Sequence, residues 1–309
     1  MTGIFDILAP VIAMIAIGYA LARSGILTPA GEAGLSGVVF YVTTPALMFR
    51  ATAAAGPALS DLRIMAGYFL PCLLLYAAWA ILARKRFGQG LGAAGLGAMG
   101  ASFGNTVLLG VPIIERLHGG PGLRILVVIV SIHSAILFTL TTLFATADRG
   151  RIGGAAAGFL ALRNAAANPI VLSIGCGALA GALGVHLPHA LDTTLAVLGT
   201  ATVPIALIAV GASLAGFALR RVALPCAAIA AAKLLALPLA VWISGRYVFA
   251  LDPLTVAVST LAAALPTGTN VHVLARRYAI AVDTAAGVVL LSTLAGAGTI
   301  PLAIVLLGR

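Results

Sequence analysis

Charge is scarce in this sequence. Only 8% of its 309 residues are Asp, Glu, Lys or Arg, whereas soluble domains contain about 25%. Hydrophobic residues make up 61%, and the mean hydropathy is +1.14. This composition excludes a soluble globular protein and predicts an all-α polytopic membrane protein.

Acidic residues are scarcer still, with eight against 18 basic residues. None of them lies at the centre of an apolar stretch, so the sequence offers neither a carboxylate proton relay nor a charged Na⁺ cage. The net charge of +10 does not indicate nucleic-acid binding. The basic residues lie almost wholly in short loops, as topology signals do.

Cysteine and catalytic motifs are also nearly missing. Cys72, Cys176 and Cys226 lie in apolar segments without CxxC spacing, so we expect small buried side chains and neither a disulfide framework nor a metal site. The sequence lacks HExxH, GxSxG and P-loop motifs, which excludes the common classes of membrane enzyme. We therefore expect no enzymatic activity and no bound cofactor.

Long apolar stretches fill the rest of the chain. A bilayer crossing needs about 20 apolar residues, and the first stretch has no convincing cleavage site, which favours a retained span. Loops with most of the basic residues fall on one side. The positive-inside rule makes that side cytoplasmic, with both termini outside a bacterial inner membrane. The ten predicted spans are 4–22, 34–54, 62–83, 91–114, 123–146, 165–184, 192–215, 222–244, 253–275 and 282–307.

The two halves of the chain match each other at an offset of 159 residues. The longest loop, around 147–164, divides residues 1–150 from residues 164–309. Because each half holds five spans, the halves must insert in opposite directions, as inverted repeats of many transporters do. The matched residues are Pro10 with Pro169, Gly18 with Gly177, Gly25 with Gly184, and Pro45 with Pro204.

Two of the predicted spans, the fourth and the ninth, are interrupted by Gly, Pro and Asn. A broken helix is tolerated in a bilayer only where protein or a water-filled cavity covers its free backbone groups. Paired interruptions in corresponding places indicate a transporter's substrate site, and packing kinks are the alternative explanation. The candidate substrate-binding residues are Asn105, Thr106, Gly110, Pro112, Pro266, Thr267, Gly268, Thr269 and Asn270.

Lys233 lies near the centre of an otherwise apolar span. A charge at that depth costs about 2.5–3.5 kcal/mol on insertion scales and indicates a functional role. Lys233 is thus a candidate counter-charge for an anionic substrate or an internal tether. A lysine that snorkels to the interface or is neutralised by burial is the alternative.

Three further residues are candidates for proton or ion coupling. His133 lies mid-span and could relay protons, although a hydrogen-bonded core histidine is equally compatible with the sequence. Glu115 and Asp283 flank the broken spans, and solvated caps are the alternative for both. Pro45 and Pro204 are candidate hinges that could equally serve packing.

The motifs around these residues resemble the auxin efflux carrier family, which includes plant PIN auxin exporters and bacterial malonate-transporter-like permeases. The resemblance covers essentially the whole chain. It implies ten helices with outward termini, a scaffold with a mobile transport unit, and helices that cross at prolines in the fourth and ninth spans. The segments that carry it are Phe40–Phe49, Asn105–Pro112, Val203–Leu214, Lys233–Pro238 and Leu265–Ala275.

The sequence therefore predicts a secondary-active transporter of small organic anions, such as the dicarboxylate malonate. Without the long cytoplasmic loop of many plant relatives, the chain resembles the compact bacterial form, and auxin is not the expected substrate. Na⁺ or H⁺ would be the coupling ion. An uncoupled channel-like or ligand-sensing protein is the alternative. The expected partners are the substrate and membrane lipid; a homodimer stays open.

Overall fold

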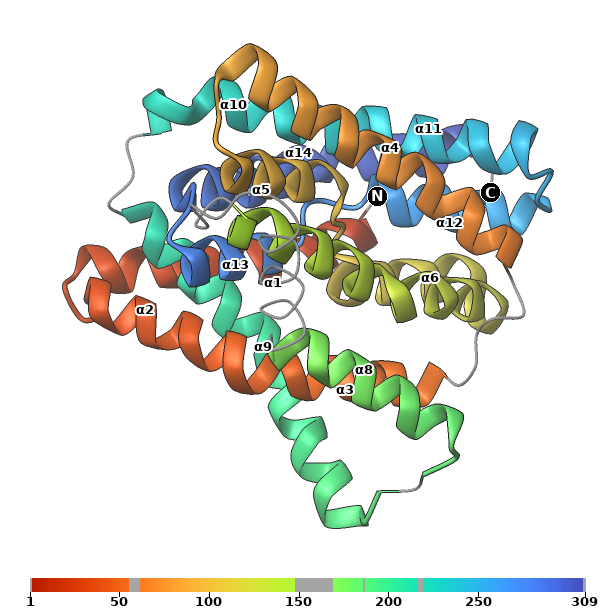
Figure 1. The fold of residues 1–309 in the computed structure, drawn as a ribbon, viewed down its shortest axis with the longest axis horizontal. Coiled ribbons are helices and arrows are strands. Elements are labelled where there is room, and N and C mark those ends of the chain that lie inside the picture. Colours follow the sequence, from red (N-terminus) through yellow and green to blue (C-terminus); the bar gives the residue numbers. More distant parts are fainter. Residues whose placement is uncertain (1, 56–61, 148–168, 186, 216–218, 308–309) are drawn as a thin grey trace.

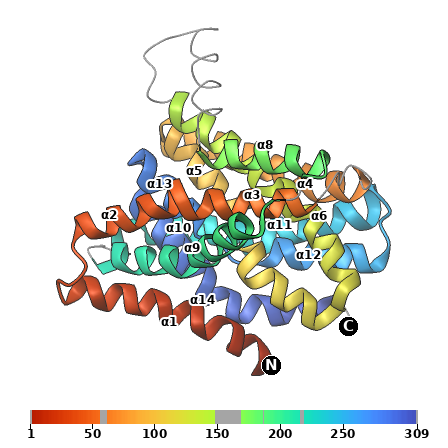
Figure 2. The ribbon, with the colours of Figure 1, turned by 90° about the horizontal axis from the view of Figure 1, so that it is seen from below.

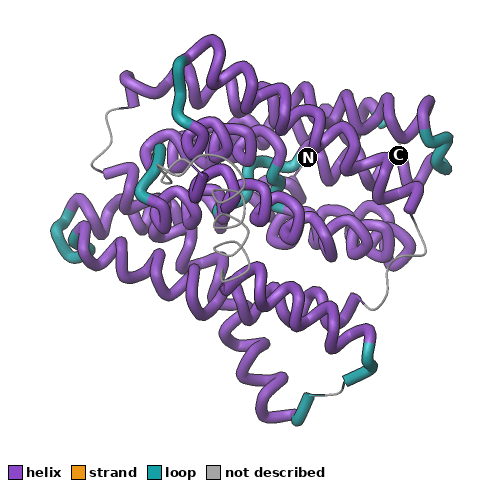
Figure 3. The backbone as a smooth tube through the Cα atoms, viewed as in Figure 1, coloured by secondary structure: helices purple, strands orange, loops and turns teal. Residues whose placement is uncertain are grey.

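A computed structural model gives the arrangement of the chain in space (Figures 1 and 3). The described residues are almost entirely helical and form no sheet, which confirms the predicted helical class. Most of the loop expected at 147–164, and the start of the span expected at 165, lie outside the described residues. The structure describes residues 2–55, 62–147, 169–185, 187–215 and 219–307.

Several of the predicted spans correspond to long helices. Three shorter apolar helices, Ile12–Arg23, Leu172–Ala182 and Pro253–Ala264, fall within the predicted first, sixth and ninth spans. In the described part of the chain, six helices have the length and composition to cross a membrane: Pro29–Ala54, Leu62–Phe87, Val128–Ala147, His189–Ala212, Leu224–Val248 and Val282–Leu306.

Five helices pack mainly with one another and form what we call the first bundle. Four of them, α2, α3, α8 and α9, lie in the lower part of Figure 1, and α1 runs through its middle. Within it, α1 lies along α9, and α3 lies along α8 and α9. A π-helical turn, Val39–Thr43, carries α2 into α3 without interruption. The helices are α1 (Thr2–Arg23), α2 (Pro29–Val38), α3 (Thr44–Ala55), α8 (Pro169–Ala182) and α9 (His189–Ala215).

Glycines allow these helices to approach closely. A Cβ atom on Gly18 of α1 would lie 2.0 Å from the Ile208 carbonyl oxygen of α9. A Cβ atom on Gly177 of α8 would lie 2.4 Å from the Phe49 carbonyl oxygen of α3. Neither distance is physically possible, so the backbones touch because both positions lack a side chain. Small residues at such contacts are how helices associate in lipid, where the hydrophobic effect is missing.

The remaining helices form a second group, which we call the crossover bundle. The chain bends sharply inside α6 at Gly119, whose φ of 57° and ψ of −152° are not helical. Two π-helical turns, Ala232–Ala236 and Ser244–Val248, extend α10 and α11. The helices are α4 (Leu62–Phe87), α5 (Leu91–Ser102), α6 (Val111–Ala147), α10 (Leu219–Ala231), α11 (Leu237–Ile243), α12 (Pro253–Ala264), α13 (Asn270–Tyr278) and α14 (Val282–Leu306).

The two bundles meet through an apolar cluster. Ile15 of α1 and Leu207 of α9 come from the first bundle, and Val289 of α14 comes from the crossover bundle. Leu109 and Leu265, which adjoin the two interrupted spans, are buried in the same cluster. At this cluster the bundles are joined by apolar packing, which is non-directional.

The three cysteines are free in the structure. Cys72 and Cys226 are buried, as expected from the sequence, whereas Cys176 is exposed on α8. The expectation of a small buried side chain is therefore wrong for Cys176, because its face of the helix points out of the first bundle.

Close packing of α8 on α3 can be tested with two neighbouring glycines. Gly177→Ala should lower the melting temperature, because overpacking a tight contact costs about 1–3 kcal/mol. Gly175→Ala is the matched control, since a Cβ atom there meets nothing within 4 Å. Melting of both variants in detergent measures the difference. Equal melting temperatures for the two would contradict the close contact.

Candidate functional site

The two interrupted helices cross each other at their breaks. α5 ends at Ser102 and α12 ends at Ala264, and an extended residue follows each end. Helix resumes at Thr106, in a π-helical turn that leads into α6, and at Asn270 in α13. Both predicted interruptions therefore lie where the sequence places them.

Two reciprocal hydrogen bonds join the breaks. The Asn105 backbone N–H donates to the Pro266 carbonyl at 2.8 Å, and the Gly268 N–H donates to the Phe103 carbonyl at 3.0 Å. They enclose an antiparallel bridge between Gly104 and Thr267. Backbone groups freed by a break cannot form hydrogen bonds with lipid. Here each break provides hydrogen-bond partners for free N–H and carbonyl groups of the other.

Glycine at the crossing is a steric requirement. A Cβ atom on Gly268 would lie 2.7 Å from the Phe103 ring, and one on Gly104 would lie 3.2 Å from the Ala262 carbonyl oxygen. Gly110 faces the other break in the same way, since a Cβ atom there would lie 2.9 Å from Leu265. The absence of side chains at these glycines lets the two non-helical segments approach closely.

Lys233 is fully buried beside the second break. Its Nζ donates hydrogen bonds to the carbonyl oxygens of Ala263, at 2.5 Å, and Leu265, at 2.6 Å. These carbonyls lie at the C-terminal end of α12, where the break removes their intrahelical donors. A cation also interacts favourably with a helix C-terminus. The contacts are those of an internal tether, one of the two functional roles that the sequence suggests.

Neutral groups support the first break. The Thr267 hydroxyl donates to the Gly100 carbonyl at 2.8 Å, near the C-terminal end of α5. The Thr267 N–H in turn donates to the Ser292 hydroxyl at 3.0 Å, which ties the crossing to α14. Thr267 is therefore buried and connects three segments through its hydrogen bonds.

His133 touches the crossing directly. The Gly104 N–H donates to His133 Nε2 at 3.3 Å, so this nitrogen carries no proton in the structure. The ring packs against Phe103 and Tyr68, with centroid distances of 4.8 and 5.7 Å. The other ring nitrogen, Nδ1, is buried and has no hydrogen-bond partner among the described residues.

Asn105 and Asn270 flank the crossing and are half-buried. Neither side-chain amide makes a hydrogen bond within the described part of the chain, although both sit where a helix resumes. Thr106 and Thr269 beside them are buried. Two amides and two helix N-termini, which carry partial positive charge, thus lie on the same crossing.

Other predicted site residues lie elsewhere. Glu115 and Asp283 are exposed, so neither belongs to the buried crossing. Pro112 lies in the first turn of α6, and its side chain is outside the described ones. Pro45 and Pro204 are half-buried within α3 and α9, where the helices run on without a break.

A buried carboxylate was not predicted. Glu32 is 5% exposed and lies within α2, because Thr28 caps that helix by accepting the Gly31 N–H and Pro29 follows in its first turn. The predicted span began only at residue 34. The Thr-Pro pair is a recognised helix start signal, and it would have placed Glu32 inside the helix.

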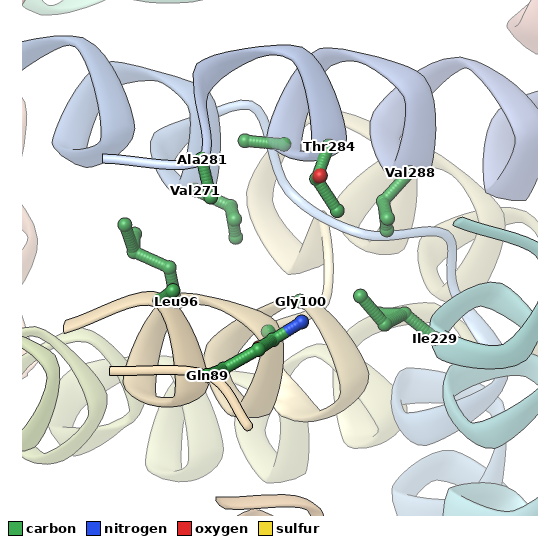
Figure 4. Close-up of a pocket in the computed structure, with 11 residues that line it drawn as sticks. Gln89, Leu96, Gly100, Ile229, Val271, Ala281, Thr284 and Val288 are labelled. Carbon is green, nitrogen blue, oxygen red and sulfur yellow. The ribbon is translucent and has the colours of Figure 1, made fainter. Parts of the chain in front are cut away.

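A small cavity reaches the crossing from one side (Figure 4). Gly100, whose carbonyl accepts the Thr267 hydroxyl, lies in its wall, and Gln89 and Thr284 add polar atoms. Its volume is about 30 Å³, far below the roughly 300–1,000 Å³ of small-molecule sites. The crossing is therefore closed to a dicarboxylate from this side.

Apolar helices with two broken segments that cross at a small polar centre are an arrangement found in membrane transporters. Comparison with known proteins identifies the family. A family model described as "Membrane transport protein" matches residues 4–152 and 155–304. The chain belongs to this family, which confirms the resemblance to auxin efflux carriers.

One curated relative matches nearly the whole chain. It is a protein of Rhizobium meliloti (strain 1021) that bears the name "Putative malonate transporter". The two sequences are 26% identical over 308 residues, which covers 97% of this chain and 94% of the relative. The similarity therefore extends over nearly the full length of both chains.

The tether role of Lys233 predicts a loss of stability without any ligand. Lys233→Met leaves two buried carbonyls unpaired, and each unsatisfied group costs about 1–3 kcal/mol. The ligand-free variant should therefore melt at a clearly lower temperature in detergent. Lys85→Met is the control, because Lys85 is exposed and is the other lysine of the chain. Unchanged melting of Lys233→Met would contradict the tether.

Proposed function

We propose that this protein is a secondary-active transporter of small organic anions, with dicarboxylates such as malonate as substrates, and that the crossing is its substrate site. Membership in a membrane transport family supports the transport function. The name of the Rhizobium meliloti relative supports malonate as the first substrate to test. The observation that carries the proposal is the pair of half-buried asparagine amides beside two helix N-termini.

The charges around the crossing favour an anion. Asn105 and Asn270 can each donate two N–H groups to a carboxylate, and helix N-termini favour negative charge. Lys233 adds the nearest cationic group, whose Nζ lies 3.5 Å from the position of a Cβ atom on Gly104. No described acidic side chain is buried at the crossing, so nothing there opposes a negative substrate.

Alternating access would come from motion of the crossover bundle against the first bundle. The cluster around Ile15, Leu207 and Val289 is apolar, so sliding there would break no directional bond within it. The small cavity beside Gly100 does not admit a dicarboxylate, so we expect the substrate to enter from another side or in another arrangement of the bundles. Exchange between two such arrangements would be a shear motion, a small sliding of packed helices past one another.

Pairs of helix contacts support the inverted repeat. Gly18 meets Ile208, and Gly177 meets Phe49; residues 18 and 177, like 49 and 208, are separated by the sequence offset of 159. A structure built from two related halves should contain each such contact twice, with the partners exchanged. We infer two five-helix repeats of opposite orientation, with the fourth and ninth helices crossing.

The arrangement of turns supports the proposed sidedness. In Figure 1 the α1–α2, α4–α5 and α13–α14 turns lie at the left end, and the C-terminus lies toward the right. In Figure 2, which is turned by 90° about the horizontal axis, the α1–α2 turn again lies at the left and the two termini lie further to the right. Arginines and a lysine end α1, α4 and α13, so the left end would face the cytoplasm.

Exchange of labelled malonate across proteoliposomes tests the transport function. We expect saturable counterflow, in which unlabelled malonate inside drives uptake of the labelled compound. A carrier exchanges its substrate in this way, whereas a channel or a ligand sensor does not. Uptake that needs no internal malonate and does not saturate would replace the carrier with the channel-like alternative.

Variants of the two asparagines test the site. Asn270→Ala should raise the dissociation constant about 10-fold to 100-fold, which corresponds to one charge-assisted hydrogen bond of about 1.5–3 kcal/mol. Asn270→Asp should lose more affinity, because its carboxylate repels the anionic substrate. The same two substitutions at Asn105 should have the same effects. Ligand-induced thermal stabilisation gives the affinities. Wild-type affinity in all of these variants would place the site elsewhere.

A further inference from the structure

Glu32 is an unusual carboxylate for this chain. Among the acidic side chains that the structure describes, it alone is buried, with 5% of its surface exposed. It lies in the first turn of α2, in the first bundle. Because a buried ionised carboxylate is unfavourable unless it is paired, its partners indicate what it does.

Those partners come chiefly from the other bundle. The Arg276 guanidinium of α13 forms a close ion pair with Glu32 Oε2, and His272 Nε2, also in α13, lies 3.5 Å from Oε1. The Ser36 hydroxyl of α2 donates to Oε1 at 3.3 Å. The carboxylate therefore joins α2 of the first bundle to α13 of the crossover bundle.

The same helix begins at the crossing. α13 runs from Asn270 to Tyr278, and His272 and Arg276 lie four residues apart, on one face. From Asn270 to Arg276 the helix rises only about 9 Å, at 1.5 Å per residue. A displacement of the second break must therefore move the two groups that hold Glu32.

Arg277, next in α13, strengthens the contact between the bundles. Its guanidinium lies over the Phe40 and Tyr41 rings of the turn after α2, 5.5 and 5.2 Å from their centroids. We call Glu32, His272 and Arg276 the latch. His272 and Arg276 face Glu32 with charged or titratable groups. Of the other helices packed on α13, α5 contains no ionisable residue and α14 brings Asp283, which is exposed.

We propose that Glu32 is the proton-binding site of this transporter, and that its protonation opens the latch and frees α13 to move with the crossing. The inference rests on the proposed transport function. Separating the bundles with Glu32 ionised would leave a carboxylate without its cation in a buried place, which is strongly unfavourable. A protonated Glu32 carries no charge, so Arg276 can leave it. Arg276 is 26% exposed, which gives water a route to the cluster.

Hydrogen–deuterium exchange of the ligand-free protein in detergent tests the latch without any substrate. After correction for intrinsic rates, residues 270–278 of the wild type should be protected near neutral pH and should lose protection when the pH is lowered far enough to protonate Glu32. Glu32→Gln, which mimics the protonated acid, should show the low protection at both pH values. Protection of Glu32→Gln that still depends on pH as in the wild type would overturn the latch.

Glu115→Gln is the matched control, because Glu115 is the other glutamate of the chain and is exposed. It should exchange as the wild type does at both pH values. If Glu115→Gln abolished the pH dependence while Glu32→Gln preserved it, the proton site would lie at Glu115 and the proposal for Glu32 would be wrong.

Proteoliposomes then connect the latch to transport. A pH gradient should drive malonate accumulation in the wild type, and Glu32→Gln should lose this accumulation while it keeps counterflow at equal pH. Accumulation by Glu32→Gln equal to that of the wild type would overturn the coupling role. Absence of any malonate counterflow in the wild type would instead contradict the proposed substrate, and the exchange measurement would still decide the latch.

Discussion

The structure depends on two backbone hydrogen bonds between the broken helices. Asn105 N–H to the Pro266 carbonyl, and Gly268 N–H to the Phe103 carbonyl, join segments that are far apart in sequence. In a bilayer, neither segment could leave its helix without another partner for its backbone. Each break is therefore possible only because the other is present. This mutual dependence fixes where the two halves of the crossover bundle meet.

Other features of the crossing follow from this pair of bonds. Glycine suits positions 104 and 268 because a Cβ atom on Gly268 would collide with the Phe103 ring and one on Gly104 would be tight against the Ala262 carbonyl oxygen. Lys233 donates hydrogen bonds to two carbonyls at the end of α12 that lose their intrahelical donors at the second break. Thr267 donates to a carbonyl near the end of α5. Because Lys233 and Thr267 already bind these carbonyls, we propose the half-buried Asn105 and Asn270 amides as the groups that bind the substrate. In the proposed mechanism, a displacement of the second break would move α13, which begins at Asn270, and with it the Arg276 side chain that pairs with Glu32.

Much of this could be predicted from the sequence. Gly, Pro and Asn inside apolar stretches located both breaks, because few residue types permit a helix to stop in a membrane. The sequence limited Lys233 to a counter-charge for the substrate or an internal tether. It could not decide between them, since an apolar span does not reveal which carbonyls lie near its centre. Glu32 was missed for a different reason: its partner Arg276 is 244 positions away in the chain. No local pattern carries such a contact, although the Thr28-Pro29 start signal would have placed Glu32 within a helix. Conversely, Glu115 and Asp283 seemed near the breaks in sequence but are exposed.

A cryo-electron microscopy structure with malonate in lipid nanodiscs tests the central claim, that the crossing of the broken helices is the substrate site. The account predicts density for one dicarboxylate within hydrogen-bond distance of the Asn105 and Asn270 amides, with the bridge between Gly104 and Thr267 intact. Malonate density away from the crossing, or broken helices that no longer touch, would contradict it.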